Sequence, residues 1–227
     1  MSKSDFHTLN KVVQNRKTQK VLADPAAPLP KLAEQAGLRD HVHDAIQLAG
    51  WAPFHYDRKL DGIREPWRFH VIWKDTCEEI SRRIPSMFDD VKPSNKLRSM
   101  LSACGALILV NWLPQFRGAE TSSEFSAEKQ LQIDDEHLAA TACAVQTLLL
   151  ALTTKGFGTY WSSGGFFRTQ KMFNELGIAS TERLLAAVFI DFAPDSHNEL
   201  IVERIPGKHR DHRSNWSAWT NEISLKQ

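Results

Sequence analysis

Two short basic segments lie near the two ends of the chain, and their side chains could attract an anion. The N-terminal group is Arg16, Lys17, Thr18 and Lys20, three cations and one hydroxyl within five residues. The C-terminal group is a run of basic residues and histidines at positions 208–213, which includes Lys208 and Arg210. Clusters of this kind are most often solvated surface, so each segment alone leaves both interpretations open.

A polar loop that carries His55 is the second candidate. Apolar residues at helical spacing run up to Ala49, and Pro53 cannot continue that helix. After Pro66 the chain alternates as a half-buried strand does, with Phe69, Val71 and Trp73 on one face. A loop that is fixed at both ends in this way can hold a planar ligand. Most loops only connect elements, however, and an ordinary connection remains the alternative.

The third candidate is a turn rich in small residues. Trp161, Ser162, Ser163 and Gly164 follow a short strand that begins near Gly156. The glycine pair at positions 164 and 165 would let the backbone approach a ligand closely, because glycine has no Cβ. A tight turn beside a core tryptophan is the structural alternative.

Several other chemistries find no support in the sequence. The chain has no His-Glu-x-x-His, no Gly-x-Ser-x-Gly and no Gly-x-Gly-x-x-Gly that opens a helix after a strand, which argues against zinc, serine-nucleophile and Rossmann sites. Three widely spaced cysteines form no metal or redox pattern and suit a reducing cytoplasm. The 28 Lys and Arg residues balance 27 Asp and Glu residues, so nucleic acid or an anionic membrane surface is not expected as a partner. Neither a signal peptide nor a spanning helix is expected.

The order of the elements predicts an α+β fold in which a central mixed sheet is flanked by helices. Strands are expected after Pro66, at 103–110, near 156–162 and at 185–192, and helices lie between them. A helix at 75–84 should end at Pro85. One domain over residues 1–227 is expected, with an irregular excursion at 113–129 that could cover a site. Spacing alone does not distinguish this fold from a doubly wound sheet.

A long helix through residues 138–152 is predicted to be buried on every side. Its residues are apolar almost all round, and Asp134 or Asp135 would serve as its N-cap. In a chain of this size, part of that burial could come from a second copy of the same chain.

Four of these motifs, in this order, resemble the FMN-dependent nitroreductase family. The similar segments are Arg16 to Lys20, Ala52-Pro53-Phe54-His55 followed by Pro66-Trp67-Arg68-Phe69, Gly156 to Gly164, and the basic C-terminus. The likeness is closest to small members with an Ala-Pro-x-His loop, and it covers residues 12–213. The chain departs from the pattern at Phe54, Tyr56 and Glu65, and its loop at 56–64 is longer by several residues.

The resemblance implies the nitroreductase α+β fold, a homodimer with two flavin sites at the interface, and FMN as cofactor. It implies phosphate and pyrimidine contacts from Arg16, Lys17, Thr18 and Lys20, with a further cation from Lys208 or Arg210. It also implies that His55 and the turn formed by Trp161, Ser162, Ser163 and Gly164 lie against the flavin. No protein group is then needed as catalytic acid or base, since the flavin carries the redox chemistry.

The activity that the resemblance implies is electron transfer from NAD(P)H to a small acceptor by a ping-pong mechanism. Nitroaromatics and quinones are the acceptors it suggests. A specialised family member is one alternative, for instance a dehalogenase, a dehydrogenase or a flavin-fragmenting enzyme. A protein that binds FMN without turnover is another.

Overall fold

The structure is a computed structural model that describes residues 3–29, 37–59, 62–87, 95–116, 125–191 and 203–206. The helices are α1 (Lys3–Asn15), α2 (Leu38–Ala49), α3 (Lys74–Met87), α4 (Asn95–Ala103), α5 (Ala127–Thr154), the 3-10 helix η2 (Gly165–Arg168) and α6 (Gln170–Leu176). The strands are β1 (Gln19–Leu22), β2 (Trp67–Trp73), β3 (Ala106–Trp112), β4 (Gly158–Ser162), β5 (Arg183–Asp191) and β6 (Glu203–Pro206).

The central sheet has the strand order β2-β3-β5-β4, and each neighbouring pair is antiparallel. The doubly wound alternative is therefore wrong, because that fold needs parallel strands joined by crossovers. A mixed sheet, with both parallel and antiparallel pairs, was predicted. In the part of the chain described, the one parallel pairing is the bridge between Thr18 and Thr159. This bridge brings the start of β1 beside β4, while β1 itself pairs with β6 in a separate two-stranded sheet.

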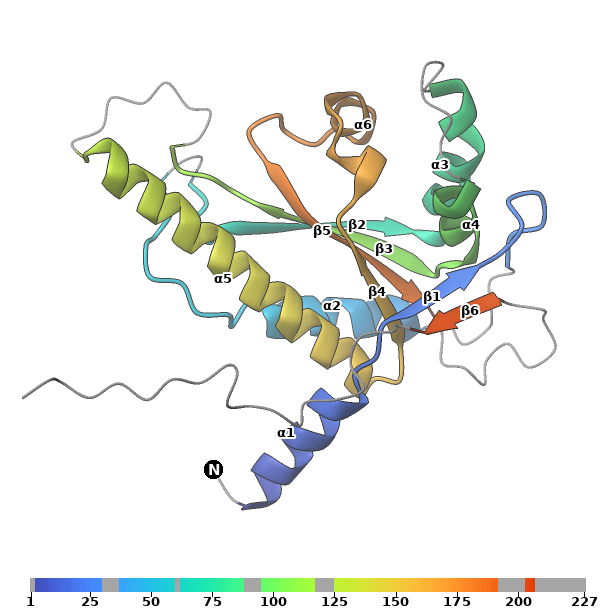
Figure 1. The fold of residues 1–227 in the computed structure, drawn as a ribbon, viewed down its shortest axis with the longest axis horizontal. Helices are drawn as coiled ribbons and strands as arrows, with labels where there is room; N and C mark the ends of the chain where they lie inside the picture. Colours follow the sequence, from blue (N-terminus) through green and yellow to red (C-terminus); the bar gives the residue numbers. More distant parts are fainter. Residues whose placement is uncertain are drawn as a thin grey trace, which may run out of the picture.

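Helices cover both faces of the central sheet (Figure 1). On one face α2 and α5 pack against Ile108, Val110 and Val188. On the other face α3, α4 and α6 pack against Leu107, Leu109 and Phe189. Strand β3 is buried at every position, as its continuous apolar run predicts for a strand covered on both sides.

Helix α5 begins earlier than the sequence predicted. Its N-cap is Ser126, whose side chain accepts a hydrogen bond from the backbone N–H of Lys129 over 3.2 Å. The assignment of Asp134 or Asp135 as N-cap was wrong. Asp134 lies inside the helix and is buried, and its Oδ1 accepts the backbone N–H groups of Gln115 and Phe116 at 2.7 and 3.1 Å. It therefore fixes the chain that leaves β3.

One face of α5 is open to solvent in the single chain. Val145, Leu148 and Leu152 face the sheet, whereas Ala139, Cys143 and Gln146 are exposed. By length and mean hydropathy α5 could cross a bilayer, but half of its most apolar window is buried inside the molecule, as in the core helix of many soluble proteins. The long helix crosses the sheet diagonally from the region of β2 to the region of α1 and β4 (Figure 1).

Helix α3 continues through Pro85 to Met87, so the prediction that Pro85 ends it was wrong. Proline has no N–H, and the carbonyl of Ser81, four residues earlier, loses its usual helical donor. Nε of Arg98, on the neighbouring helix α4, donates to that carbonyl over 3.0 Å instead. A tertiary contact thus supplies the hydrogen bond that Pro85 removes.

Candidate functional site

The N-terminal basic segment lies beside β4. Arg16 is the first residue after α1, at the start of the connection to β1. Its backbone N–H donates to the carbonyl of Val12 over 3.0 Å, and only 5% of the residue is exposed. Lys17 is exposed and Thr18 is half-buried. Because Thr18 forms a parallel bridge to Thr159, these three residues lie beside the start of β4, and the turn that follows Trp161 lies at its other end.

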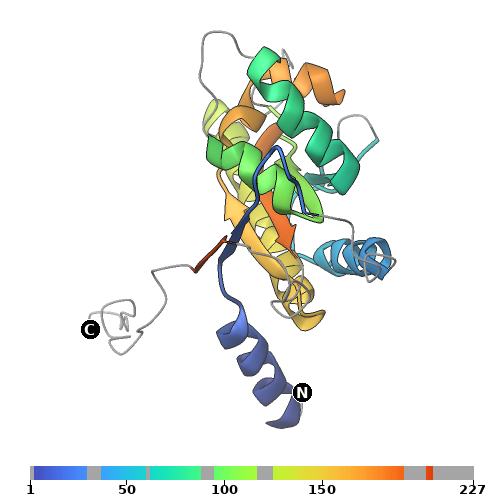
Figure 2. The same cartoon turned by 90° about the vertical axis from the view of Figure 1, so that its right-hand side faces the viewer.

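The register of β1 and β6 brings the two ends of the chain together. Gln19 pairs with Pro206 and Leu22 with Glu203. The chain therefore leaves β6 at the end of β1 that adjoins Arg16, Lys17 and Thr18. Lys208 and Arg210 lie outside the described residues, so their assignment stays a prediction. Figure 2 shows β1 and β6 side by side, with α1 extending away from the rest of the molecule.

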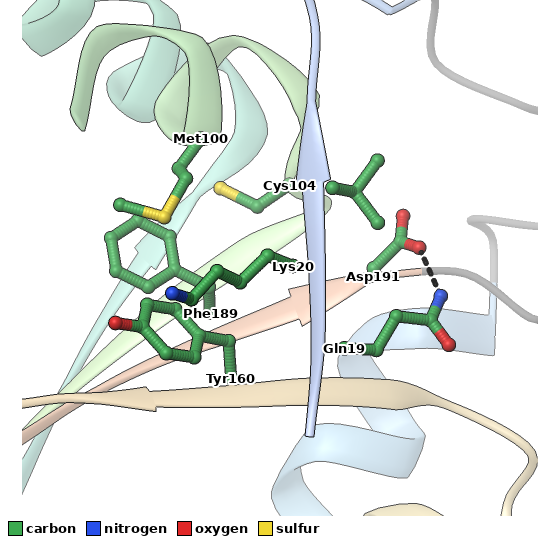
Figure 3. Close-up of a pocket in the computed structure, with 8 residues that line it drawn as sticks. Gln19, Lys20, Met100, Cys104, Tyr160, Phe189 and Asp191 are labelled. Carbon is green, nitrogen blue, oxygen red and sulfur yellow. Dashed lines mark hydrogen bonds between the residues drawn. The ribbon is translucent and has the colours of Figure 1, made fainter. Parts of the chain in front are cut away.

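Lys20 points to a different face of the sheet. Its Nζ lies 4.4 Å from the centroid of the Tyr160 ring, beside Met100, Cys104 and Phe189 in a small pocket between β1 and α4 (Figure 3). Tyr160 pairs with Phe189 across the sheet and Trp161 pairs with Val188, so the two aromatic side chains lie on opposite faces. The structure thus does not bring the Lys20 ammonium group together with Trp161.

The turn after β4 has the glycine geometry that the sequence predicted. Gly164 has φ +101° and Gly165 has φ +50°. A Cβ on Gly164 would lie 2.3 Å from Cδ2 of Leu184, whereas a Cβ on Gly165 would meet open space. Trp161 is 38% exposed, Ser162 is half-buried and Ser163 is exposed. The turn thus presents backbone and small side chains at the surface next to a tryptophan.

Sequence reasoning missed Arg168, which contacts this turn. Its Nε donates to the carbonyl of Ser163, and its Nη2 donates to the carbonyl of Leu185 over 3.3 Å. The N–H of Gly164 donates to Oγ of Ser162 over 3.2 Å. A cation shortly after a glycine pair is too common a pattern to have identified Arg168 in advance.

His55 lies at the opposite edge of the sheet. It is exposed, and its ring contacts that of Tyr56 with centroids 4.7 Å apart. The loop leads into β2, which is separated from β4 by β3 and β5. Three strand spacings amount to roughly 14 Å. Within one chain, therefore, the structure does not bring His55 together with Arg16 or Trp161.

The loop around His55 is fastened to the first half of α5. Nε2 of His137 donates to the carbonyl of Tyr56 over 3.0 Å, and Nζ of Lys129 donates to the Tyr56 hydroxyl. The backbone N–H of Lys59 donates to Oε1 of Gln115 over 3.0 Å. The loop thereby meets the start of the expected 113–129 excursion. Residues 117–124 of that excursion lie outside the described residues, and 127–129 already form the first turn of α5.

A buried carboxylate, also missed from the sequence, links β2 and β3 to the start of β5. Glu182 precedes β5 and accepts hydrogen bonds from Nη1 of Arg68 at 3.1 Å, Nε2 of His70 at 2.7 Å and Nδ2 of Asn111 at 2.8 Å. Burial by itself raises the pKa of Glu182, but the hydrogen bonds from His70 and Asn111 and the charges of His70 and Arg68 outweigh it. The pKa of Glu182 therefore lies below its ordinary value, and the carboxylate stays ionised.

The described residues include a basic segment that could attract an anion and a glycine turn that a ligand could approach closely. They include no metal site. Among them, no group of three or more His, Cys, Asp or Glu side chains could hold a metal ion. Arg16, Lys17 and Thr18 stand at one end of β4, and the Gly164 turn stands at the other. A ligand with an anionic end and a flat body fits that arrangement.

Comparison with known proteins identifies the family and the fold. The model of the nitroreductase family matches residues 34–190. Comparison with curated proteins gives no match. A nitroreductase-like family protein from Bacillus cereus superposes with a TM-score of 0.64 at 18% identity, over 96% of each chain.

Two further solved structures share the fold. A nitroreductase family protein from Streptococcus pneumoniae has a TM-score of 0.56 at 16% identity, over 95% of this chain and 100% of that one. A protein from Desulfovibrio desulfuricans, determined in complex with FMN, has a TM-score of 0.55 at 17% identity, over 96% and 98%. At these identities the likeness establishes the fold, and the match of the family model over most of the sequence establishes the kinship: the chain belongs to the nitroreductase family.

Proposed function

We propose that this protein is an FMN-dependent oxidoreductase that passes electrons from NAD(P)H to a small acceptor. The observation that carries the proposal is the bridge between Thr18 and Thr159, which sets the basic segment beside the strand that leads to the glycine turn. Family membership and an FMN complex of a protein with the same fold support the choice of cofactor.

The residues present fit FMN. Its phosphate carries close to two negative charges, which suits the Arg16 guanidinium, the Lys17 ammonium and the Thr18 hydroxyl. The flat ring system needs a surface without protruding side chains, and Gly164 and Gly165 provide one. Lys20 is the exception, because its ammonium group is directed at Tyr160 on the other face. We therefore leave Lys20 out of the proposed set.

Each group has a defined part in this arrangement. Bound FMN supplies the two-electron chemistry, with a nicotinamide as donor and a nitroaromatic or quinone as acceptor. Arg16, Lys17 and Thr18 hold the phosphate. The turn at 162–165 presents its backbone to the polar edge of the ring, and Trp161 forms an adjacent wall. The N–H of Gly164 itself already donates to Oγ of Ser162. None of these residues has to gain or lose a proton.

The proposed site is completed by a second copy of the chain. His55 lies on the loop that leads into β2, and β2 is three strand spacings, roughly 14 Å, from β4. We propose that His55 instead contacts the flavin held at β4 of another chain. The exposed face of α5 runs between the two regions. Helix α1 also carries exposed apolar residues at helical spacing, namely Phe6, Leu9 and Val13. We propose that α1 and α5 form the interface of a homodimer.

Cysteine labelling tests the dimer. Cys77 and Cys104 are buried, and burial and a hydrogen bond with Cys104 raise the pKa of Cys77, so both thiols should react slowly. Cys143 is exposed in the single chain, on the open face of α5. If that face is the interface, the native protein has no fast-reacting thiol and the urea-unfolded protein has three. One fast-reacting thiol in the native protein would place Cys143 outside the interface.

Two measurements test the activity. The denatured protein should release close to one FMN per chain. Oxidation of NADH or NADPH with a nitroaromatic or a quinone should give parallel double-reciprocal lines, because donor and acceptor use the same open face in turn. A colourless protein that does not take up added FMN would contradict the cofactor, and intersecting lines would contradict the shared face.

A specialised acceptor is the second candidate, favoured by the loop at 54–59. Hydrogen bonds give this loop a fixed shape beside the start of the 113–129 excursion. Tyr56 contacts His137 and Lys129, and Lys59 contacts Gln115. If this loop borders the opening through which the acceptor enters, its fixed shape would suit a narrow range of acceptors. Removing its fastening by His137→Ala should then change acceptor preference more than FMN affinity. We expect the enzyme to work in the cytoplasm, where NAD(P)H is available.

A further inference from the structure

A single side chain ties the turn after β4 to the neighbouring strand. Nε of Arg168 donates to the carbonyl of Ser163 in the turn, and Nη2 donates to the carbonyl of Leu185 in β5 at 3.3 Å. The N–H groups of a guanidinium lie in one plane at fixed angles. A two-point contact of this kind fixes the turn relative to the sheet, which a single flexible donor would not do.

The peptide between Ser163 and Gly164 is held from both sides. Its carbonyl accepts from Arg168, and its N–H donates to Oγ of Ser162 over 3.2 Å. Because a peptide unit is planar, fixing its carbonyl and its N–H fixes its orientation. The hydrogen bonds thus set the direction in which this part of the turn faces.

The glycines make such a restraint necessary. A glycine pair has more conformational freedom than any other pair of residues, and that freedom must be lost when the turn meets a ligand. A Cβ on Gly164 would lie 2.3 Å from Cδ2 of Leu184, so a side chain fits there only if Leu184 moves. Glycine at this position therefore lets Leu184 pack closely against the turn. Another group is then needed to keep the flexible glycine pair in one conformation.

We infer that Arg168 is a positioning residue, which holds the Ser163–Gly164 peptide ready for the flavin ring. The inference rests on the proposed function of this turn as a flavin contact. A turn that is held in one conformation before binding loses less conformational freedom on binding, so affinity for the ring increases. A competing account is that the Arg168 charge simply attracts the FMN phosphate.

Amide hydrogen exchange in the flavin-free protein tests the restraint itself. Arg168→Ala removes both contacts, and Arg168→Lys keeps the charge without the planar fork. Both variants should speed the exchange of the backbone amides of residues 163–165 by roughly 10-fold. Arg82→Ala is the matched control, since exposed Arg82 pairs only locally with Glu79 on α3, and it should leave these amides unchanged. Exchange at the wild-type rate in both Arg168 variants would overturn the inference.

Binding of FMN and of riboflavin, which lacks the phosphate, separates the two accounts. If Arg168 positions the turn, both variants weaken both ligands by the same factor, roughly 3- to 10-fold. If Arg168 attracts the phosphate, Arg168→Ala weakens FMN alone and Arg168→Lys restores it, which would overturn the inference. A wild-type protein that binds neither flavin would contradict the proposed function and the flavin role of Arg168 together, and the exchange result would then show whether the restraint itself is correct.

Discussion

The two halves of the proposed flavin site differ in how one chain builds them. At β4, a bridge sets the segment Arg16 to Thr18 beside the start of the strand, and the hydrogen bonds of Arg168 hold the Gly164 turn at its other end. At β2, the loop with His55 is fixed just as firmly, but its fastening is to Lys129 and His137 of α5 and not to the other half. The described residues of the first half are positioned by contacts within a single chain, whereas His55 of the second half is exposed.

This difference assigns a separate task to each half, cofactor binding to the half at β4 and substrate approach to the half at β2. The half at β4 has the groups that would hold the cofactor, and its geometry depends on contacts within one chain. The half at β2 has an exposed imidazole and an atypical loop, which suit the approach of a substrate to a neighbouring chain. Changes at β4 should therefore affect flavin affinity strongly, and changes at the His55 loop should affect it weakly.

The largest effect is expected for Arg16→Ala. A hydrogen bond to a charged group contributes about 1.5–3 kcal/mol, so FMN affinity should fall by roughly 10- to 100-fold. Lys17→Ala should act in the same direction to a smaller extent, because Lys17 is exposed. Fluorescence titration of FMN measures both. Unchanged affinity in two folded variants would remove the phosphate assignment from the half at β4.

The glycine turn offers a matched pair of variants. Gly164→Ala introduces a Cβ 2.3 Å from Leu184 Cδ2 at φ +101°, and should cost about 2–3 kcal/mol of the free energy of unfolding. Gly165→Ala meets open space at φ +50° and should cost about 1 kcal/mol. Urea unfolding compares the two. Equal losses would mean that close packing of the turn on Leu184 is not needed.

Glu182, between the two halves, should have a pH-dependent effect on stability. Its folded-state pKa is lowered, so the stability that its carboxylate provides is present above the ordinary pKa and is lost as pH falls through the folded-state value. Glu182→Gln should cost about 1–2 kcal/mol at neutral pH, and its deficit should shrink on acidification. Urea unfolding at several pH values measures this, and a constant deficit would contradict the role of the charge.

His55→Ala should have the smallest effect on the flavin. A contact from an exposed ring contributes less than about 1 kcal/mol, so FMN affinity should change by less than roughly 5-fold. The KM for the acceptor should change more than the affinity for FMN. A loss of FMN as large as that in Arg16→Ala would mean that the two halves do not divide the tasks in this way.

Local patterns in the sequence predicted the elements well. The helical spacing up to Ala49 and the alternation after Pro66 gave α2 and β2, because hydrophobic periodicity depends on neighbours along the chain. The predictions at Pro85 and Asp134 were wrong because distant partners decide both: Arg98 compensates the lost helical hydrogen bond, and the backbone after β3 occupies the Asp134 carboxylate.

The site was only partly accessible to sequence reasoning. The order of the segments around Arg16, Thr18 and Gly164 indicated which ones to combine, and the structure places them at the two ends of β4. The contacts of Arg168 and Glu182 join residues far apart in sequence or depend on the direction of one side chain, so no local pattern could have predicted them. The side chain of Lys20 points toward Tyr160, and this direction could not be predicted from a local pattern either.

The most direct test of the central claim is a joint measurement of mass and flavin content on one purified sample. Light scattering should give about twice the 25.8 kDa mass of the chain, and the absorption spectrum should show close to one FMN per chain in that same species. A folded 25.8 kDa monomer that retains FMN would contradict a site completed by two chains.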